Sequence, residues 1–289
     1  MTPTLVRHHR YADTPAPVDT GTRARDWAEI QERMLSPLYE AVYERLDVGT
    51  GTRMLSLGCG SGLALLIAAA RGARVTGVET DPDRLALARE RLLPPGADGP
   101  AGRAGPYAAG PGVPPRLVDG DPSAAPADGA PYTLLTAFDP IGGTAGDSEA
   151  LTPELRSAVP LAARGAAVVL TGWGPPERCA TAAVLEVAER LADPSGGARR
   201  PARRDDLEEV AARAGLRPDG SGRVSCPFGY ADLESAVRGL LSTGLFDAAV
   251  RATDRDQVAG EIAEALRPHR RSDGTVWMPN VFRYLVCLC

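Results

Sequence analysis

The feature that most constrains the fold is the stretch "RMLSLGCGSGLALLIAAARG" at residues 53–72, where an apolar run leads through glycines into a second apolar run. A strand, a glycine turn and a helix in this order form a binding turn for nucleotides or nucleosides in several folds. The glycines are Gly58, Gly60 and Gly62. A P-loop needs a lysine, which the chain lacks, and the dinucleotide fingerprint needs glycine where Leu63 stands. The turn therefore fits neither phosphate-binding form well.

Two acidic residues follow the next two predicted strands. Glu79 ends "RVTGVE", at the distance of about 20 residues where an acid can accept both hydroxyls of a ribose, and Asp121 follows "RLVDG". Ligands of open α/β sheets bind at the carboxyl ends of the strands, so both acids are expected at one edge. Two acids beside a glycine turn suit a nucleoside with a positively charged appendage in place of a phosphate.

Short apolar runs alternate with helical patterns over the first two-thirds of the chain, which predicts a parallel sheet covered by helices on both faces. A helix is expected at residues 22–46, kinked or split at Pro37. Strands are expected at residues 54–57, 74–79, 116–121, 132–138, 165–173, 222–230 and 275–289. We divide the chain into N-terminal cap helices at 1–48, a core at 49–229 with 274–289, and a helical cap insertion at 230–273.

Five motifs follow one another in order: "MLSLGCGSG", "VTGVETDPDRLALAR", "RLVDGDP", "YTLLTAFD" and "RGAAVVLTGWGPPE". In that order they resemble the motifs of class I S-adenosylmethionine-dependent methyltransferases, over residues 22–179. The ending "PNVFRYLV" resembles bacterial small-molecule members of that family. The resemblance implies a Rossmann-like fold, with a seven-stranded, mostly parallel sheet, helices on both faces and a helical cap. It also implies S-adenosylmethionine as the cofactor.

By this resemblance, the glycines let the backbone approach the methionyl end of the cofactor and Glu79 holds the ribose. Asp121 meets the adenine amino group, and the region around Phe138 lies under the sulfonium. The family usually has an acid where this chain has Ser56, so a neutral hydroxyl faces the methionyl amino group. The expected cofactor-binding residues are Ser56, Gly58, Cys59, Gly60, Gly62, Glu79, Thr80, Asp121, Pro122 and Phe138.

The sequence says less about the molecule that accepts the methyl group than about the cofactor. No "[DN]PP[YFW]" motif follows the fourth strand, which argues against the amino groups of adenine or glutamine, and the metal-dependent catechol type needs a lysine. We expect methyl transfer to a small organic acceptor, most readily an oxygen in secondary metabolism. A non-methylating, cyclase-like catalyst on the same fold, a nucleoside-binding domain without activity and an NAD-dependent reductase are the alternatives.

The candidate general bases are His8 and His9, in an N-terminal segment that can close over the substrate in this fold. Residues near the predicted ligand edge or on the cap helices are candidates for substrate contact, although packing explains aromatic residues at helical spacing equally well. These candidates are Trp27, Tyr39, Trp173 and Tyr230.

Net charge and the spacing of the cysteines limit the kinds of ligand and partner that the chain is expected to bind. The net charge of −5 and the pI near 5.4 argue against a nucleic-acid or anionic-membrane surface. No apolar stretch reaches the ~20 residues of a membrane span, and the N-terminus lacks the apolar core of a signal peptide. Five scattered cysteines without metal-ligand spacing indicate a reduced, cytoplasmic protein and no bound metal. A homodimer is left open.

Overall fold

The computed structural model describes residues 20–93, 114–125, 130–143, 146–192 and 206–289. His8 and His9 lie outside these ranges, as does nearly all of the glycine- and proline-rich segment at residues 94–115.

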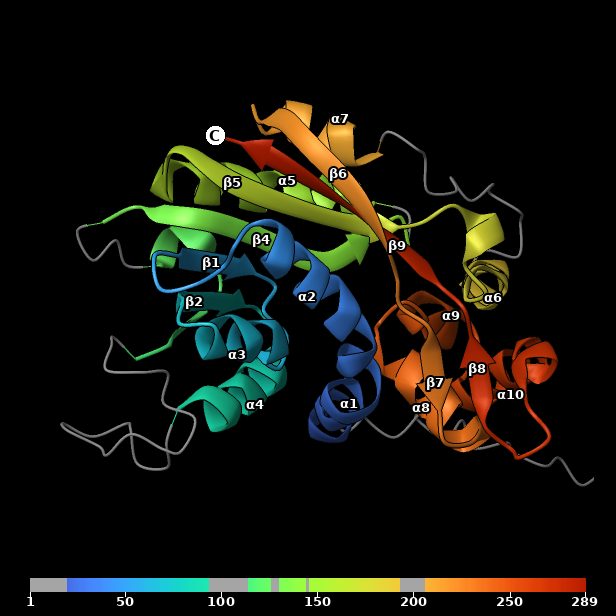
Figure 1. Ribbon diagram of the computed structural model, residues 1–289. Coiled ribbons are helices and arrows are strands. Elements are labelled where there is room, and N and C mark those ends of the chain that lie inside the picture. Colours follow the sequence, from blue (N-terminus) through green and yellow to red (C-terminus); the bar gives the residue numbers. More distant parts are fainter. Residues whose placement is uncertain (1–19, 94–113, 126–129, 144–145, 193–205) are drawn as a thin grey trace, which may run out of the picture.

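Seven strands form the central sheet in the order β3-β2-β1-β4-β5-β9-β6 (Figure 1). The pairs among β1 to β5 are parallel, whereas β9 is antiparallel to both β5 and β6. The predicted seven-stranded, mostly parallel sheet is thereby confirmed. The strands are β1 (Arg53–Leu57), β2 (Arg74–Glu79), β3 (Arg116–Asp119), β4 (Tyr132–Ile141), β5 (Ala162–Trp173), β6 (Arg217–Ser225), β7 (Phe228–Tyr230), β8 (Val276–Met278) and β9 (Val281–Leu288).

Helices cover both faces of the sheet, because each face is apolar and is buried in its own cluster. One cluster joins the sheet to α2, α3, α6 and α8 to α10, and the other joins it to α5 and α7. The helices are α1 (Thr20–Asp26), α2 (Ser36–Arg45), α3 (Leu63–Ala70), α4 (Pro82–Leu92), α5 (Asp147–Ala158), α6 (Ala182–Ala192), α7 (Asp206–Arg213), α8 (Leu233–Ser242), α9 (Asp247–Ala252) and α10 (Arg255–Ala265).

The N-terminal helical segment changes its winding ahead of Pro37. After α1 the chain forms a π-helical segment, η1 (Trp27–Gln31), and a 3₁₀ segment, η2 (Glu32–Leu35). Pro37 then lies in the first turn of α2, where its missing N–H is no loss. The irregular winding places the side chains of Gln31 and Glu32 in the interior, where both are buried.

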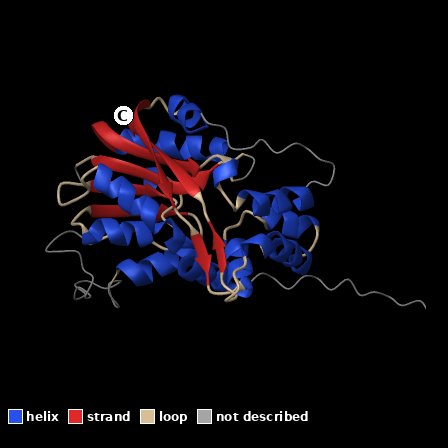
Figure 2. Ribbon diagram, turned by 45° about the vertical axis from the view of Figure 1, so that its right-hand side comes forward, coloured by secondary structure: helices blue, strands red, loops and turns tan. Residues whose placement is uncertain are grey.

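Two segments expected as single strands are each divided at a proline. Residues 222–230 fall in β6 and β7 with Pro227 between them, and residues 275–289 fall in β8 and β9 with Pro279 between them. Proline cannot donate to a strand ladder, so it interrupts both. β7 and β8 pair as a separate two-stranded sheet beside the large one (Figure 2).

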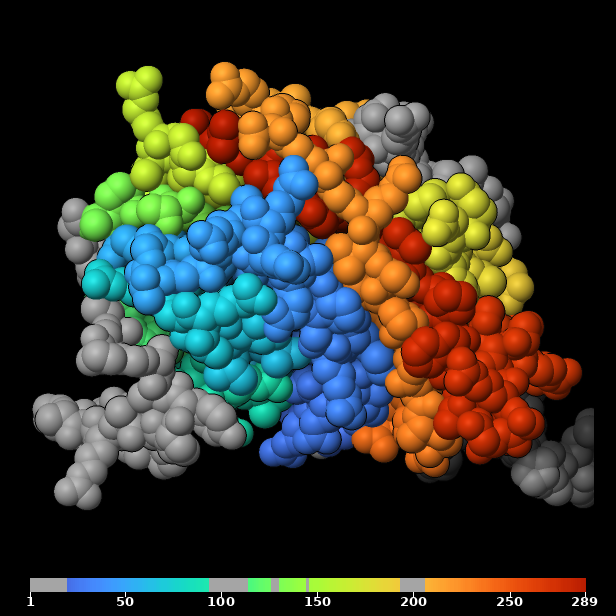
Figure 3. Space-filling view, viewed as in Figure 1, coloured from blue at the N-terminus to red at the C-terminus, as the bar shows by residue number. Residues whose placement is uncertain are grey.

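The helices α8 to α10 follow β7 and precede β8 in the chain (Figures 1 and 3). α8 packs against α1 and η1, whereas α9 and α10 pack mainly against α6. Tyr230 donates a hydrogen bond of 2.9 Å to Oε1 of Gln31, and Arg238 forms an ion pair with Asp26. The two helical regions therefore form one body beside the sheet. None of the helices in the described ranges has the length and apolar character needed to cross a membrane.

Candidate active site

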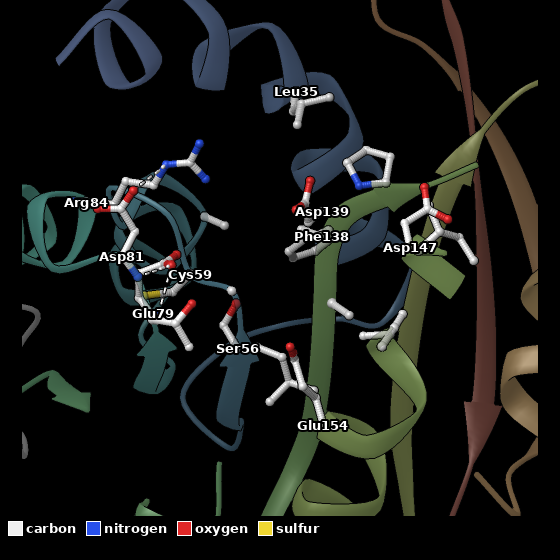
Figure 4. A pocket seen from close by; sticks show the side chains of 18 of the residues that line it. Leu35, Ser56, Cys59, Glu79, Asp81, Arg84, Phe138, Asp139, Asp147 and Glu154 are labelled. Atoms are coloured by element: carbon white, nitrogen blue, oxygen red, sulfur yellow. Dashed lines mark hydrogen bonds and ion pairs between the residues drawn. The ribbon is translucent and has the colours of Figure 1, made fainter. Parts of the chain in front are cut away.

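A cleft of about 370 Å³ opens at the carboxyl ends of β1, β2 and β4. Figure 4 shows Glu79, Asp81 and Arg84 on one side of it, Phe138 and Asp139 on the other, and Ser56 between them. The N-terminal helical segment closes the cleft from above. This is the edge at which open α/β sheets bind their ligands.

The glycine turn requires its glycines. Gly58, Gly60 and Gly62 all have positive φ, at 58°, 58° and 82°, a conformation that residues with a side chain rarely adopt. A Cβ atom on Gly60 would lie 2.9 Å from Oε1 of Glu32 and 3.2 Å from Nε1 of Trp27. The turn is thus packed tightly against the N-terminal helical segment on one side.

Glu79 closes onto the glycine turn. Its Oε2 accepts a hydrogen bond of 2.8 Å from the N–H of Gly60, and its Oε1 accepts bonds of 2.9 Å from the N–H groups of Thr80 and Asp81. The side chain is 6% exposed and lines the cleft. A carboxylate oxygen can accept two hydrogen bonds, so Oε2 keeps capacity for a ligand hydroxyl.

Glu32 holds the same turn from behind. Its Oε1 accepts hydrogen bonds from the N–H groups of Ser61 at 3.1 Å and Leu63 at 3.4 Å, and its Oε2 pairs with Arg91 at 2.9 Å. The first N–H groups of a helix have no partner within the helix, and Glu32 supplies one to the start of α3. The sequence does not predict a role for Glu32, because an acidic residue on an amphipathic helix is expected to lie on the solvent-exposed face of that helix.

The end of β4 provides the opposite wall. Phe138 packs against Tyr39 and Tyr43, with ring centroids 4.8 and 5.7 Å apart. The pairing of β4 with β5 shifts register between Ala137 and Ile141, and such irregularities re-aim side chains beside active sites. Asp139 lies within this irregular stretch and lines the cleft, where its side chain reaches solvent although protein atoms of the cleft surround its carboxylate.

Some carboxylates of the cleft are fixed by the backbone. Asp81 begins α4 as its N-cap and accepts a bond of 2.9 Å from the N–H of Asp83, as the sequence predicted. Asp147 accepts bonds of 2.8 and 2.9 Å from the N–H groups of Gly142 and Gly143. These side chains shape the turns that frame the cleft.

Asp139 and Glu154 differ, because neither makes a hydrogen bond or an ion pair within the part of the chain that the structure describes. Burial raises the pKa of Asp139; Arg84 opposes this shift, and repulsion from Glu79 and Asp147 adds to it. Burial likewise raises the pKa of Glu154, and neighbouring carboxylates add to the effect. The cleft thus contains two acidic groups whose charge is not neutralised by a fixed partner.

Arg84 is the cation that lines the cleft among the described residues. Its guanidinium lies 4.4 Å from the ring centroid of Trp27 and donates to the backbone oxygen of Ser242 at 3.3 Å. Nε1 of Trp27 is buried without a hydrogen-bond partner in the described structure. Arg84 therefore connects the core to both the N-terminal helices and α8.

The structure brings most of the predicted site residues together. Those that line the cleft are Trp27, Tyr39, Ser56, Gly58, Cys59, Glu79, Thr80 and Phe138. Those that do not line it are Gly60, Gly62, Asp121, Pro122, Trp173 and Tyr230.

Asp121 has a local role. It caps the short segment η3 (Pro122–Ala124) by accepting a bond of 2.7 Å from the N–H of Ser123, and that bonding lowers the pKa of Asp121. Trp173 packs in an aromatic group with Phe228 and Phe282.

No set of three His, Cys, Asp or Glu side chains in the described ranges is placed to hold a metal ion.

Comparison with known proteins agrees with this geometry. The model of the family described as "Methyltransferase domain" matches residues 55–109. The methyltransferase GfsG of Streptomyces halstedii is 36% identical over 92 residues, which is 32% of this chain and 30% of that protein. The match thus spans less than a third of this relative's length.

Solved structures share the fold at low identity. A candidate methyltransferase from Bacillus halodurans C-125 has a TM-score of 0.52 at 13% identity, covering 86% of this chain and 97% of the other. The YcgJ protein of Bacillus subtilis has a TM-score of 0.50 at 13% identity, with the same coverage. These solved structures show that the chain shares their fold, and the match to the methyltransferase domain family covers residues 55–109.

Proposed function

We propose that this protein transfers the methyl group of S-adenosylmethionine to a small organic acceptor, and that the receiving atom is an oxygen. The observation that supports this most is the cleft, in which Glu79 closes the glycine turn at the carboxyl edge of the sheet. The same segment, residues 55–109, matches the methyltransferase domain family.

The residues of the cleft fit this cofactor. Glu79 would hold the ribose hydroxyls with the free capacity of Oε2, and the glycine turn would face the methionyl end. Ser56, which is 1% exposed and lines the cleft, would offer its hydroxyl to the methionyl amino group. When bound, S-adenosylmethionine supplies a methyl group activated on a positively charged sulfur. Uncompensated acidic groups in the cleft favour that charge.

The acceptor side supports a small molecule. Trp27, Leu35 and Tyr39 of the N-terminal helical segment line the cleft opposite Asp139, and together they form an apolar wall with one acidic group. Pockets of this kind suit small, fairly apolar organic molecules. The acidic groups of the cleft and the net charge of −5 do not favour nucleic acid as the acceptor. The five free cysteines fit a reducing compartment such as the cytoplasm.

A methyl-transfer assay tests the proposal. Protein is incubated with S-adenosylmethionine carrying a labelled methyl group and a panel of phenols, alcohols, amines and thiols, and products are identified by mass spectrometry. Labelled methyl ethers are the expected products. Tight binding of S-adenosylmethionine without transfer to any acceptor would favour the cyclase-like alternative, and binding of NAD instead would favour a reductase.

A further inference from the structure

Among the described residues that line the cleft, few groups can accept a proton. Burial raises the pKa of Tyr39 well above its ordinary value, and burial also raises the pKa of Cys59, so neither is readily available as an anion. The histidine of the described residues, His269, lies on η6 (Arg267–His269) and does not line the cleft. Within the described part of the cleft, the carboxylates are the remaining proton acceptors.

Most of those carboxylates already accept backbone hydrogen bonds. Glu79, Asp81 and Asp147 hold N–H groups of the turns around the cleft. Protonating any of them would remove an acceptor from those N–H groups. Asp139 and Glu154 have no such bond within the described structure and can gain or lose a proton without this penalty.

Asp139 and Glu154 differ in their position in the cleft. Asp139 lies on β4 next to Phe138, below the N-terminal segment that carries Leu35 (Figure 4). Glu154 comes from α5, which packs against η3, the segment that Asp121 caps (Figure 4). Since the N-terminal helices supply the apolar wall for the acceptor, Asp139 lies on the acceptor side and Glu154 on the nucleoside side.

The backbone holds Asp139 in this place. It precedes Pro140, and a residue before proline is restricted to extended conformations. The register shift of β4 between Ala137 and Ile141 breaks the ladder at the same point. An irregular, restricted stretch at the end of a central strand fixes the direction of a side chain that a regular strand would place elsewhere.

We propose that Asp139 is the general base of the reaction and that the acceptor is a phenol or alcohol whose hydroxyl must lose its proton. This rests on the proposed function. The acceptor oxygen forms a bond to the methyl carbon as the carbon–sulfur bond breaks, and that electron pair stays on sulfur, which becomes a neutral thioether. The hydroxyl proton passes to the carboxylate of Asp139 and then to solvent.

The test compares Asp139→Asn, Asp139→Glu and the unmodified protein. Asparagine keeps the shape but cannot take the proton, so kcat for a hydroxyl acceptor from the panel should fall about 100- to 10,000-fold. The rise of kcat with pH through the ionisation of Asp139 should be lost in that variant, and glutamate should restore part of both. Affinity for S-adenosylhomocysteine, measured by calorimetry, should change less than about threefold, far below the effect expected of acid–base catalysis. Asp256→Asn, an exposed change of equal charge on α10, is the control.

Several results would overturn the inference. An unchanged rate and pH profile in Asp139→Asn would do so, as would a profile that flattens in His8→Ala or His9→Ala instead. Turnover confined to amines or thiols, or no turnover of any hydroxyl acceptor by protein that binds S-adenosylhomocysteine, would exclude the acceptor class. Failure of the unmodified protein to bind S-adenosylhomocysteine would instead refute the proposed function itself.

Discussion

The two walls of the cleft differ in whether their acidic side chains have hydrogen-bond partners. On the wall formed by β1 and β2, Glu79 accepts three backbone hydrogen bonds, and Glu32 holds the glycine turn from behind. On the wall formed by β4, Asp139 makes no hydrogen bond or ion pair within the described residues. One wall is fixed before any ligand arrives, and the other keeps a proton-accepting group available.

The contrast assigns cofactor binding to the first wall and proton transfer to the second. Fixed acceptors give affinity because little has to reorganise when the ligand binds. A carboxylate without a fixed partner destabilises the protein slightly, but the raised pKa of Asp139 brings it closer to the operating pH of a base. The comparison predicts that changes on the first wall act on affinity and stability, and changes on the second act on rate and pH dependence.

Glu79→Ala should give the largest effect on binding. Loss of its hydrogen bonds should weaken binding of S-adenosylhomocysteine by about 2–4 kcal/mol, as expected for charged hydrogen bonds in a buried site. Because three N–H groups also lose their acceptor, the free energy of unfolding should fall by about 1–3 kcal/mol. Calorimetric titration and urea denaturation measure the two, and Glu79→Gln should show smaller losses. Equal affinity in the alanine variant and the unmodified protein would remove Glu79 from the site.

Glu32→Ala tests the support behind the glycine turn. Loss of its bonds to Ser61 and Leu63 and of its pairing with Arg91 should lower the free energy of unfolding by about 1.5–3 kcal/mol. The control is Glu29→Ala, an exposed position on the same segment, which should stay within about 0.5 kcal/mol. If both variants unfold at the same urea concentration, Glu32 does not hold the turn.

Glu154→Gln tests whether the unpaired carboxylates reduce stability at neutral pH. The pKa of Glu154 is raised in the folded protein, so its favourable contribution is present below the unfolded pKa and is lost as pH rises through the folded pKa. The glutamine variant should therefore be at least as stable as the unmodified protein at pH 7, with an advantage that shrinks on acidification. Urea denaturation between pH 4 and pH 8 measures this. A difference independent of pH would contradict the raised pKa.

Ser56→Asp should give the smallest effect. Ser56 lies beside Thr136 on the neighbouring strand, where the hydroxyl of Thr136 has no partner in the described structure. A carboxylate here should tighten S-adenosylmethionine a few-fold more than adenosine, since only S-adenosylmethionine carries the amino group. Equal effects on both ligands in calorimetric titrations would mean that Ser56 does not face the methionyl end.

The first wall was largely predictable from sequence because its signals are local. The glycine turn, Glu79 at the end of a strand and Asp81 ahead of a proline each follow from a few adjacent residues. A positive φ favours glycine at position 58, and Glu79 ends a strand that the apolar pattern predicts; both residues line the cleft.

The second wall and the support behind the turn could not be predicted in the same way. Glu32 reaches the turn only because η1 and η2 change the winding of the helix, and the helical pattern shows no sign of that change. In the sequence, the "FDP" that contains Asp139 lacks the aromatic residue of the "[DN]PP[YFW]" motif, so the pattern gives this acid no role. The direction of Asp139 depends on a register shift between strands that are distant in sequence.

Calorimetric titration of the unmodified protein with S-adenosylhomocysteine and, separately, with NAD tests the central claim most directly. We predict one S-adenosylhomocysteine bound per chain, with no binding of NAD, because the glycine turn has Leu63 where the dinucleotide fingerprint needs its third glycine. Binding of NAD with no heat from S-adenosylhomocysteine would contradict the assignment of the cleft.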